Sequence, residues 1–235
     1  MSAALAIEGL LNARDLGGHP TTDGERTRSG SLLRADDLAQ LTPAGIAALR
    51  HAGIRSVIDL RWPEEVTRAP NPTAQLPGIH YQHRSLLGTS EEQWVLRAGD
   101  VEKLLWKRAV LRHMGAEIRA VLAAIAGAPE GPLLFHCVAG KDRTGLIAAL
   151  LLALADVEPQ AIAADYALST TELRAGYRAR YPEVELRQIE RALACPPAGV
   201  HDMLAFLAEV GGVRRYLGGL GLSADEIARL RARLR

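Results

Sequence analysis

The chain is poor in cysteine, has almost no net charge and lacks a long hydrophobic run. Its 235 residues include two cysteines, so we exclude a disulfide framework and expect reduced thiols. The formal net charge of +1 gives no indication of binding to nucleic acid or to a membrane surface. The longest apolar run, "LIAALLLALADV", is too short for a transmembrane segment, and we expect it to be a buried helix.

The sequence also lacks internal repeats, low-complexity tracts and a linker rich in glycine and serine. We therefore expect a single domain over residues 1–235. The stretch "MSAALAIEGL" has neither the basic start nor the apolar block of a secretory signal. The protein is accordingly expected in the cytoplasm, or exported without a classical signal peptide.

Strands and helices alternate in the first part of the chain, and helices alone follow. Turn residues and apolar patterns predict strands near residues 29–36, 54–61, 79–86 and 131–137. Thr42 and Pro43 predict the start of a helix that Gly53 ends, and a helical region is expected within residues 90–126. This order predicts an α/β fold with a small, mostly parallel central sheet flanked by helices and a helical C-terminal half.

One stretch, "LLFHCVAGKDRTG" (residues 133–145), joins a predicted strand to a predicted helix through a short loop. Its small residues let consecutive backbone N–H groups turn inward, and with a helix N-terminus they form an anion cradle. Arg143 can hold two oxygens of a tetrahedral oxyanion with its planar guanidinium group. The predicted phosphate site is the whole loop: Cys137, Val138, Ala139, Gly140, Lys141, Asp142 and Arg143.

Cys137 is the candidate nucleophile of this loop. A thiol at a helix N-terminus beside cations is stabilised as the thiolate, which can attack a bound phosphate. Thr144 supplies a hydroxyl that can hydrogen-bond the sulfur and help to expel it in a second step. A preformed thiolate needs no base, so we expect His136 to orient the loop rather than to accept a proton.

The sequence "HCVAGKDRTG" resembles the His-Cys-x5-Arg-Thr/Ser signature of the cysteine-dependent protein tyrosine and dual-specificity phosphatases. The matching positions are His136, Cys137, Gly140, Arg143, Thr144 and Gly145. The stretches "NARDLGG", "LLRAD", "VIDLR" and "DYALS" occur in the order seen in a bacterial branch of atypical tyrosine and lipid phosphatases, which includes a mycobacterial tyrosine phosphatase. The resemblance spans most of the chain.

This resemblance implies a phosphotyrosine-phosphatase-like fold and metal-independent hydrolysis of phosphomonoesters through a phosphocysteine intermediate, without a cofactor. Cys137 is the implied nucleophile and Arg143 the implied phosphate clamp. The implied substrates are phosphotyrosine proteins, with phosphoserine/threonine and phosphoinositides as further candidates, and inorganic phosphate is the product. Lids occur in this branch, so residues 90–126 are a candidate mobile cover; the alternative is plain packed helices.

Three acidic residues are candidates for protonating the leaving-group oxygen. Asp142 lies in the loop, at the position where the resembled branch uses an aspartate. Asp59 of "VIDLR" ends a neighbouring strand and is the second candidate; alternatively it forms an ion pair that supports Arg143 or Arg14. A division of roles, in which Asp142 protonates the leaving group and Asp59 orients neighbouring side chains, agrees with both possibilities for Asp59. Glu64 in "WPE" imitates the Trp-Pro-Asp loop of other tyrosine phosphatases, and we interpret it as part of a local turn.

Lysine is rare in this chain, which makes Lys141 informative. Of the 28 basic residues, the lysines are Lys103, Lys107 and Lys141. A lysine inside the anion loop indicates that a compact point charge is needed there. Lysines recur in this loop of phosphatases that accept phosphoinositides, although a solvated charge at the loop rim is the alternative.

The remaining candidates lie outside the loop. Arg14 and Asp15 of "NARDLGG" are expected to support the active-site side of the sheet, although Arg14 can instead contact substrate. Cys195 is either a small buried residue or a disulfide partner of the loop cysteine under oxidation. His80 and His83 lack the clustering of a metal site.

Two other functions use a loop of this kind. A non-catalytic phosphate-binding or phosphopeptide-binding module would need the anion cradle but no nucleophile or proton donor. Sulfur transfer of the rhodanese type also uses a loop cysteine, but the Arg-Thr-Gly ending and the phosphate clamp argue against it. Phosphate release and thiosulfate sulfurtransferase assays discriminate among these functions.

Overall fold

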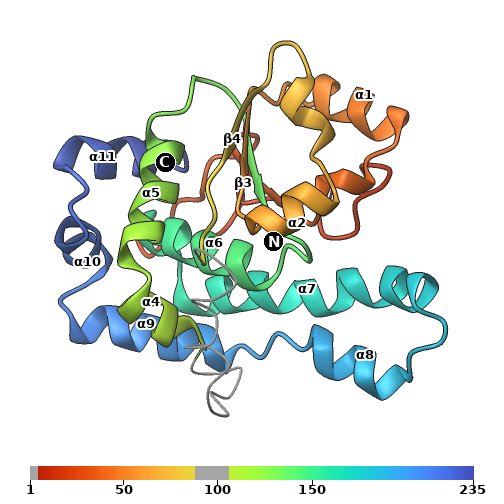
Figure 1. Cartoon of the computed structure of the whole chain (residues 1–235). Helices are drawn as coiled ribbons and strands as arrows, with labels where there is room; N and C mark the ends of the chain where they lie inside the picture. The colour runs from red at the N-terminus through yellow and green to blue at the C-terminus, as the bar shows by residue number, and fades with distance from the viewer. Residues whose placement is uncertain (1–4, 88–105) are drawn as a thin grey trace.

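Figure 1 shows the computed structural model of the chain, which describes residues 5–87 and 106–235. The described residues form a five-stranded sheet in the order β1-β2-β5-β3-β4. The strands are β1 Arg14–Asp15, β2 Leu32–Ala35, β3 Ser56–Asp59, β4 His80–His83 and β5 Leu133–His136. β1 is antiparallel to β2 and the other strands pair in parallel, so the predicted α/β fold with a mostly parallel sheet is confirmed.

Helices fill the C-terminal half, as predicted, but residues 63–68 form a short helix that includes Glu64, which we interpreted as part of a local turn. In the described part of the chain the α-helices are α1 Pro43–His51, α2 Pro63–Arg68, α4 Trp106–His113, α5 Gly115–Ala126, α6 Asp142–Leu154, α7 Pro159–Arg180, α8 Leu186–Leu193, α9 Ala198–Glu209, α10 Val213–Gly219 and α11 Ala224–Ala232. Two short 3-10 helices are η1 Leu38–Gln40 and η2 Pro72–Gln75. The predicted cap of α1 forms, because Thr42 Oγ1 accepts a hydrogen bond from Gly45 N at 3.1 Å.

β5, the central strand, is buried on both faces. Its side chains alternate between two hydrophobic clusters: Leu133 and Phe135 pack in the cluster that contains α5 and α6, and Leu134 packs in the cluster that contains Leu49 of α1. A strand that is covered on both faces has apolar residues in succession, and "LLFH" begins with three of them. The strand therefore enters the loop from the middle of the core.

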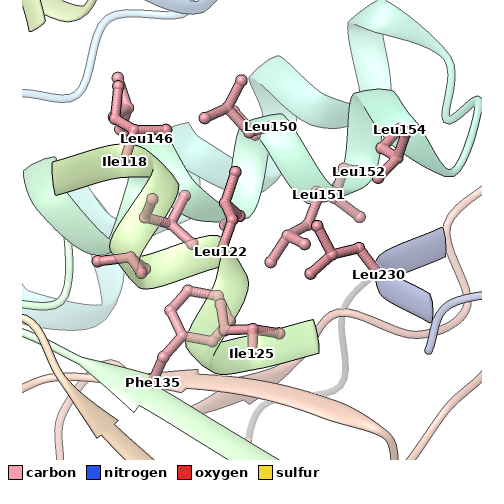
Figure 2. Close-up of a cluster of buried hydrophobic side chains, with 14 of the residues drawn as sticks. Ile118, Leu122, Ile125, Phe135, Leu146, Leu150, Leu151, Leu152, Leu154 and Leu230 are labelled. Atoms are coloured by element: carbon pink, nitrogen blue, oxygen red, sulfur yellow. The ribbon is translucent and has the colours of Figure 1, made fainter. Parts of the chain in front are cut away.

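α6, the helix after the loop, is also inside the protein. All its residues except Asp142 and Ala153 are buried, which confirms that the apolar run is a core helix. Figure 2 shows the side chains of α5, α6, β5 and α11 that meet in this cluster. Burial at both ends fixes the two points between which the loop has to run.

The predicted lid, residues 90–126, lies partly outside the described residues. The part from Trp106 onward forms α4 and α5. α5 packs against β3 and α11 within the core, so this part is packed helix, the alternative interpretation. Within the ranges that the structure describes, no helix is long and apolar enough to cross a bilayer.

Leu150→Ala tests the placement of α6. Leu150 is fully buried, and removal of its isobutyl group leaves a cavity, so we expect the free energy of unfolding to fall by about 2–5 kcal/mol in chemical denaturation. Leu186, which is 37% exposed, provides the matched control Leu186→Ala with an expected loss below about 1 kcal/mol. Equal losses in the two variants would contradict a buried α6.

Candidate active site

The loop Cys137–Arg143 begins where β5 ends, between the carboxyl ends of β2 and β3. Gly140 has a φ of +64°, and a Cβ at this position would lie 2.4 Å from the carbonyl oxygen of Ala35. The path of the loop therefore requires glycine there. Asp37 N donates a hydrogen bond to the Val138 carbonyl oxygen at 3.0 Å, which ties the loop to the chain after β2.

Two further carbonyls of the loop are held from outside. Asn12 Nδ2 donates to the Ala139 oxygen at 2.9 Å, and Arg34 Nη2 donates to the Gly140 oxygen at 2.6 Å. The N–H and C=O groups of a trans peptide point in opposite directions, so these bonds direct the next N–H groups toward the inside of the loop. Inward amides beside the N-terminus of α6 are the arrangement that an anion cradle requires.

Asp165 of α7 binds two of the arginines that support the loop. It accepts from Arg14 Nε at 2.8 Å and from Arg34 Nη1 at 2.6 Å, and all three side chains are buried. Burial alone would raise the pKa of Asp165, but Arg34 and Arg14 hold it below its usual range. Sequence reasoning did not assign a role to Asp165 or Arg34, although both lie in the stretches "DYALS" and "LLRAD" that carry the family resemblance.

Arg143 is held by a residue that the sequence analysis missed. Glu65 of α2 binds Arg143 Nη1 and Nη2 at 2.7 and 3.0 Å, and the guanidinium carbon lies 4.6 Å from the centroid of the Trp62 ring. Glu65 is itself fixed, because its Oε2 accepts from Trp62 N at 2.8 Å. The ion pair uses the two terminal nitrogens of Arg143. An oxyanion can therefore bind at the other edge of the guanidinium group, where Nε lies.

His136 connects the loop to the sheet. Its Nε2 lies 2.8 Å from Asn71 Nδ2. Its Nδ1 lies 3.2 Å from the Cys137 carbonyl oxygen. A carbonyl can only accept, so Nδ1 carries a proton and donates to it. These contacts agree with a histidine that orients the loop.

Asp59 lies at the end of β3, fully buried, and its ion-pair partner is neither of the two arginines that we considered. It pairs with Arg61 at 2.7 Å rather than with Arg143 or Arg14, and it also accepts from the Tyr81 hydroxyl at 3.0 Å. Arg61 is only two residues along the chain, and its side chain folds back onto the carboxylate. Burial alone would raise the pKa of Asp59, but neighbouring His136 and Arg61 hold it well below its usual range.

Lys141 and Asp142 form an ion pair at the start of α6. Lys141 Nζ donates to Asp142 Oδ2 at 2.7 Å, and Lys141 is buried whereas the Asp142 side chain is 45% exposed. Lys141 is therefore not the solvated rim charge that was the alternative. The adjacent Thr144 is buried, and its hydroxyl has no hydrogen-bond partner within the described part of the chain.

The other candidates occupy different positions. Arg14 supports the loop through Asp165, but Asp15 binds Gly17 N and Gly30 N and so holds the connection between β1 and β2. Both cysteines are free and buried, and Cys195 Sγ donates to the Leu193 carbonyl oxygen at 3.3 Å. The two candidate histidines make protein contacts: His80 with Gln82, and His83 with the Arg61 carbonyl oxygen.

Comparison with known proteins identifies the family. A family model described as the tyrosine phosphatase family matches residues 5–235. The chain belongs to the tyrosine phosphatase family. A tyrosine-protein phosphatase of Nostoc commune is 34% identical over 217 residues, which cover 87% of this chain and 74% of that protein. The resemblance predicted from the loop signature is thus confirmed.

The chain is also similar to a second curated protein and to a solved structure. The triple specificity protein phosphatase PtpB of Mycobacterium tuberculosis is 30% identical over 254 aligned positions, which cover 95% of this chain and 90% of that protein. This relative confirms the predicted resemblance to the mycobacterial branch. The solved structure of P. aeruginosa TpbA covers 82% of this chain and 95% of that chain, with a TM-score of 0.40 and 17% sequence identity.

Glu65→Gln tests the orientation of Arg143. Glutamine keeps the shape of the side chain but loses the charge, so we expect Arg143 to be held less firmly and vanadate to bind about tenfold more weakly in calorimetry. Glu64→Gln is the matched control, because Glu64 is the exposed neighbour on the same helix, and it should bind vanadate like the wild type. Equal weakening by both substitutions would contradict a specific role for Glu65.

Proposed function

We propose that this chain is a protein-tyrosine phosphatase, a hydrolase of phosphomonoesters that acts through a phosphocysteine intermediate and needs no metal. The observation that carries the proposal is the loop itself, in which Cys137 and Arg143 flank a cradle whose carbonyls are held outward. Membership of the tyrosine phosphatase family supports phosphotyrosine as the substrate, as does a relative named tyrosine-protein phosphatase.

The proposed reaction has two steps. In the first, the loop amides and Arg143 hold the phosphate while the Cys137 thiolate attacks phosphorus in line with the departing oxygen. The S–P bond forms as the P–O bond breaks, and the leaving oxygen takes a proton. In the second, water attacks the phosphocysteine, the S–P bond breaks and inorganic phosphate leaves. The Thr144 hydroxyl, which has no partner among the described residues, then donates a hydrogen bond to the departing sulfur.

Asp142 is the proposed proton donor of the first step. Its side chain is 45% exposed beside the loop, so it can reach both a leaving group and a water molecule. Asp59 is fully buried, and its ionised carboxylate pairs with Arg61. This supports a positioning role for Asp59 rather than proton donation. Glu64 is exposed on α2, while Glu65 next to it holds Arg143. After the first step the Asp142 carboxylate accepts a proton from the attacking water.

Lys141 supports a broader substrate range within this proposal. Its buried ammonium group adds a positive charge to the loop, next to the half-exposed carboxylate of Asp142. Phosphoinositides carry further phosphates that need further cations, and one relative is named a triple specificity protein phosphatase. We therefore include phosphoserine, phosphothreonine and phosphoinositides as candidate substrates beside phosphotyrosine.

The chemistry also bears on location. The proposed nucleophile has to remain a reduced thiolate, and the cytoplasm keeps thiols reduced. We therefore propose a cytoplasmic enzyme, with export without a classical signal peptide as the alternative. Fractionation of cells that express the protein, followed by detection with an antibody, separates the two locations.

Phosphate release from p-nitrophenyl phosphate and from a phosphotyrosine peptide, with a chelator present, tests the proposed activity. We expect turnover of both, inhibition by vanadate, and a loss of roughly a thousandfold or more in Cys137→Ser because the nucleophile is removed. Cys195→Ser is the matched control: this cysteine lies outside the loop, beside the Tyr166 hydroxyl, and its variant should retain most of the activity. Binding of the phosphopeptide by the wild type without release of phosphate would instead identify a non-catalytic phosphopeptide-binding module.

A further inference from the structure

Tyr166 of α7 contacts the proposed proton donor, and the mechanism above gives it no role. Its hydroxyl donates to Asp142 Oδ1 at 3.3 Å, while Lys141 Nζ donates to the other oxygen, Oδ2, at 2.7 Å. Tyr166 is 3% exposed, whereas the carboxylate that it binds is nearly half exposed. A buried donor therefore holds one oxygen of a carboxylate that faces solvent.

The ring of Tyr166 is fixed on two sides. It lies so close to Gly145 of α6 that a Cβ on this glycine would be 2.8 Å from the tyrosine Cδ2. Lys107 of α4 places its Nζ 3.6 Å from the ring centroid, and Lys107 is 1% exposed. Contacts with α4 and α6 thus determine where the hydroxyl of this α7 tyrosine lies.

The chemistry of this pair favours a donating hydroxyl. Burial, and then the Asp142 carboxylate, raise the pKa of Tyr166 above its usual range, so the phenol keeps its proton at neutral pH. Burial lowers the pKa of Lys107 to about 8, and at pH 7 the amine is still mainly protonated. An ammonium over the face of the ring attracts its electrons and makes the O–H group a stronger donor.

We propose that Tyr166, held by Lys107, is a positioning residue that orients the Asp142 carboxyl group for proton transfer to the leaving group. The inference rests on the proposed function of Asp142 as the proton donor. In this structure Oδ1 accepts from Tyr166 and Oδ2 accepts from Lys141. When substrate binds, Lys141 first turns from Oδ2 toward the phosphate, and Oδ2 takes up a proton from solvent. As the P–O bond breaks, this proton passes from Oδ2 to the leaving oxygen, while Tyr166 keeps its hydrogen bond to Oδ1.

Tyr166→Phe tests the inference, because it keeps the ring and removes the hydroxyl. Phenyl phosphate needs a proton on its leaving group and 2,4-dinitrophenyl phosphate does not. We expect kcat to fall about tenfold for the first and to stay within about twofold for the second, with KM unchanged for both. In an Asp142→Ala background, Tyr166→Phe should cause no further loss. Equal losses on both substrates, or an additive loss in the double variant, would overturn the inference.

Two other variants make the outcome unambiguous. Tyr216→Phe is the matched control, since this tyrosine also donates a hydrogen bond, to the Leu111 carbonyl oxygen, and its loss should not discriminate between the substrates. Lys107→Met removes the charge over the ring and should give a smaller loss with the same selectivity. If Tyr166→Phe does not fold, Lys107→Met provides the test. An equal loss of kcat on phenyl phosphate and on 2,4-dinitrophenyl phosphate in Lys107→Met would then overturn the inference.

The single variant Asp142→Ala separates this inference from the proposed function. If Asp142→Ala impairs both substrates equally, Asp142 is not the proton donor and the proposed function of this residue fails. If Asp142→Ala discriminates between the substrates and Tyr166→Phe does not, only the positioning role of Tyr166 fails.

Discussion

The pairing of Asp165 with two buried arginines is the interaction on which the rest of the site depends. Asp165 binds Arg14 and Arg34, and Arg34 also donates to the Gly140 carbonyl oxygen in the loop. All these charges are buried, so removal of one partner leaves an uncompensated charge at a cost of about 3–5 kcal/mol. The inward direction of the loop amides is therefore determined by a carboxylate on α7, outside the loop itself.

The hydrophobic core supplies the second constraint. β5 is buried, and α6 is buried except at Asp142 and Ala153, so the two ends of the loop that joins them are fixed by the core. The outward hydrogen bonds from Asn12 and Arg34 hold its middle, and Glu65 holds the arginine at its end. Donors that are already oriented before an anion arrives need no reorganisation when it binds, which is the main way in which such a cradle stabilises developing charge.

The local part of this site could be predicted from the sequence, and the long-range part could not. Cys137, Arg143 and the strand–loop–helix around them lie in one continuous stretch whose chemistry depends on neighbours along the chain. Glu65 and Asp165 reach the loop only through folding, and sequence spacing contains no information about such contacts. Asp59 shows the reverse case: we left open a proton-transfer role and an ion pair with Arg143 or Arg14, and the nearby Arg61 binds it instead. The order of strands and helices was predictable because burial on both faces of the sheet produces continuous apolar runs.

The most direct test of this account is to trap the intermediate. Acid quenching of the protein during turnover of a phosphotyrosine peptide, followed by mass spectrometry of its proteolytic peptides, would locate a transferred phosphoryl group. The account predicts that it lies on the sulfur of Cys137 and that it is absent from Cys137→Ser. A phosphoryl group on another residue, or turnover with no phosphorylated enzyme under conditions that slow the second step, would contradict the account.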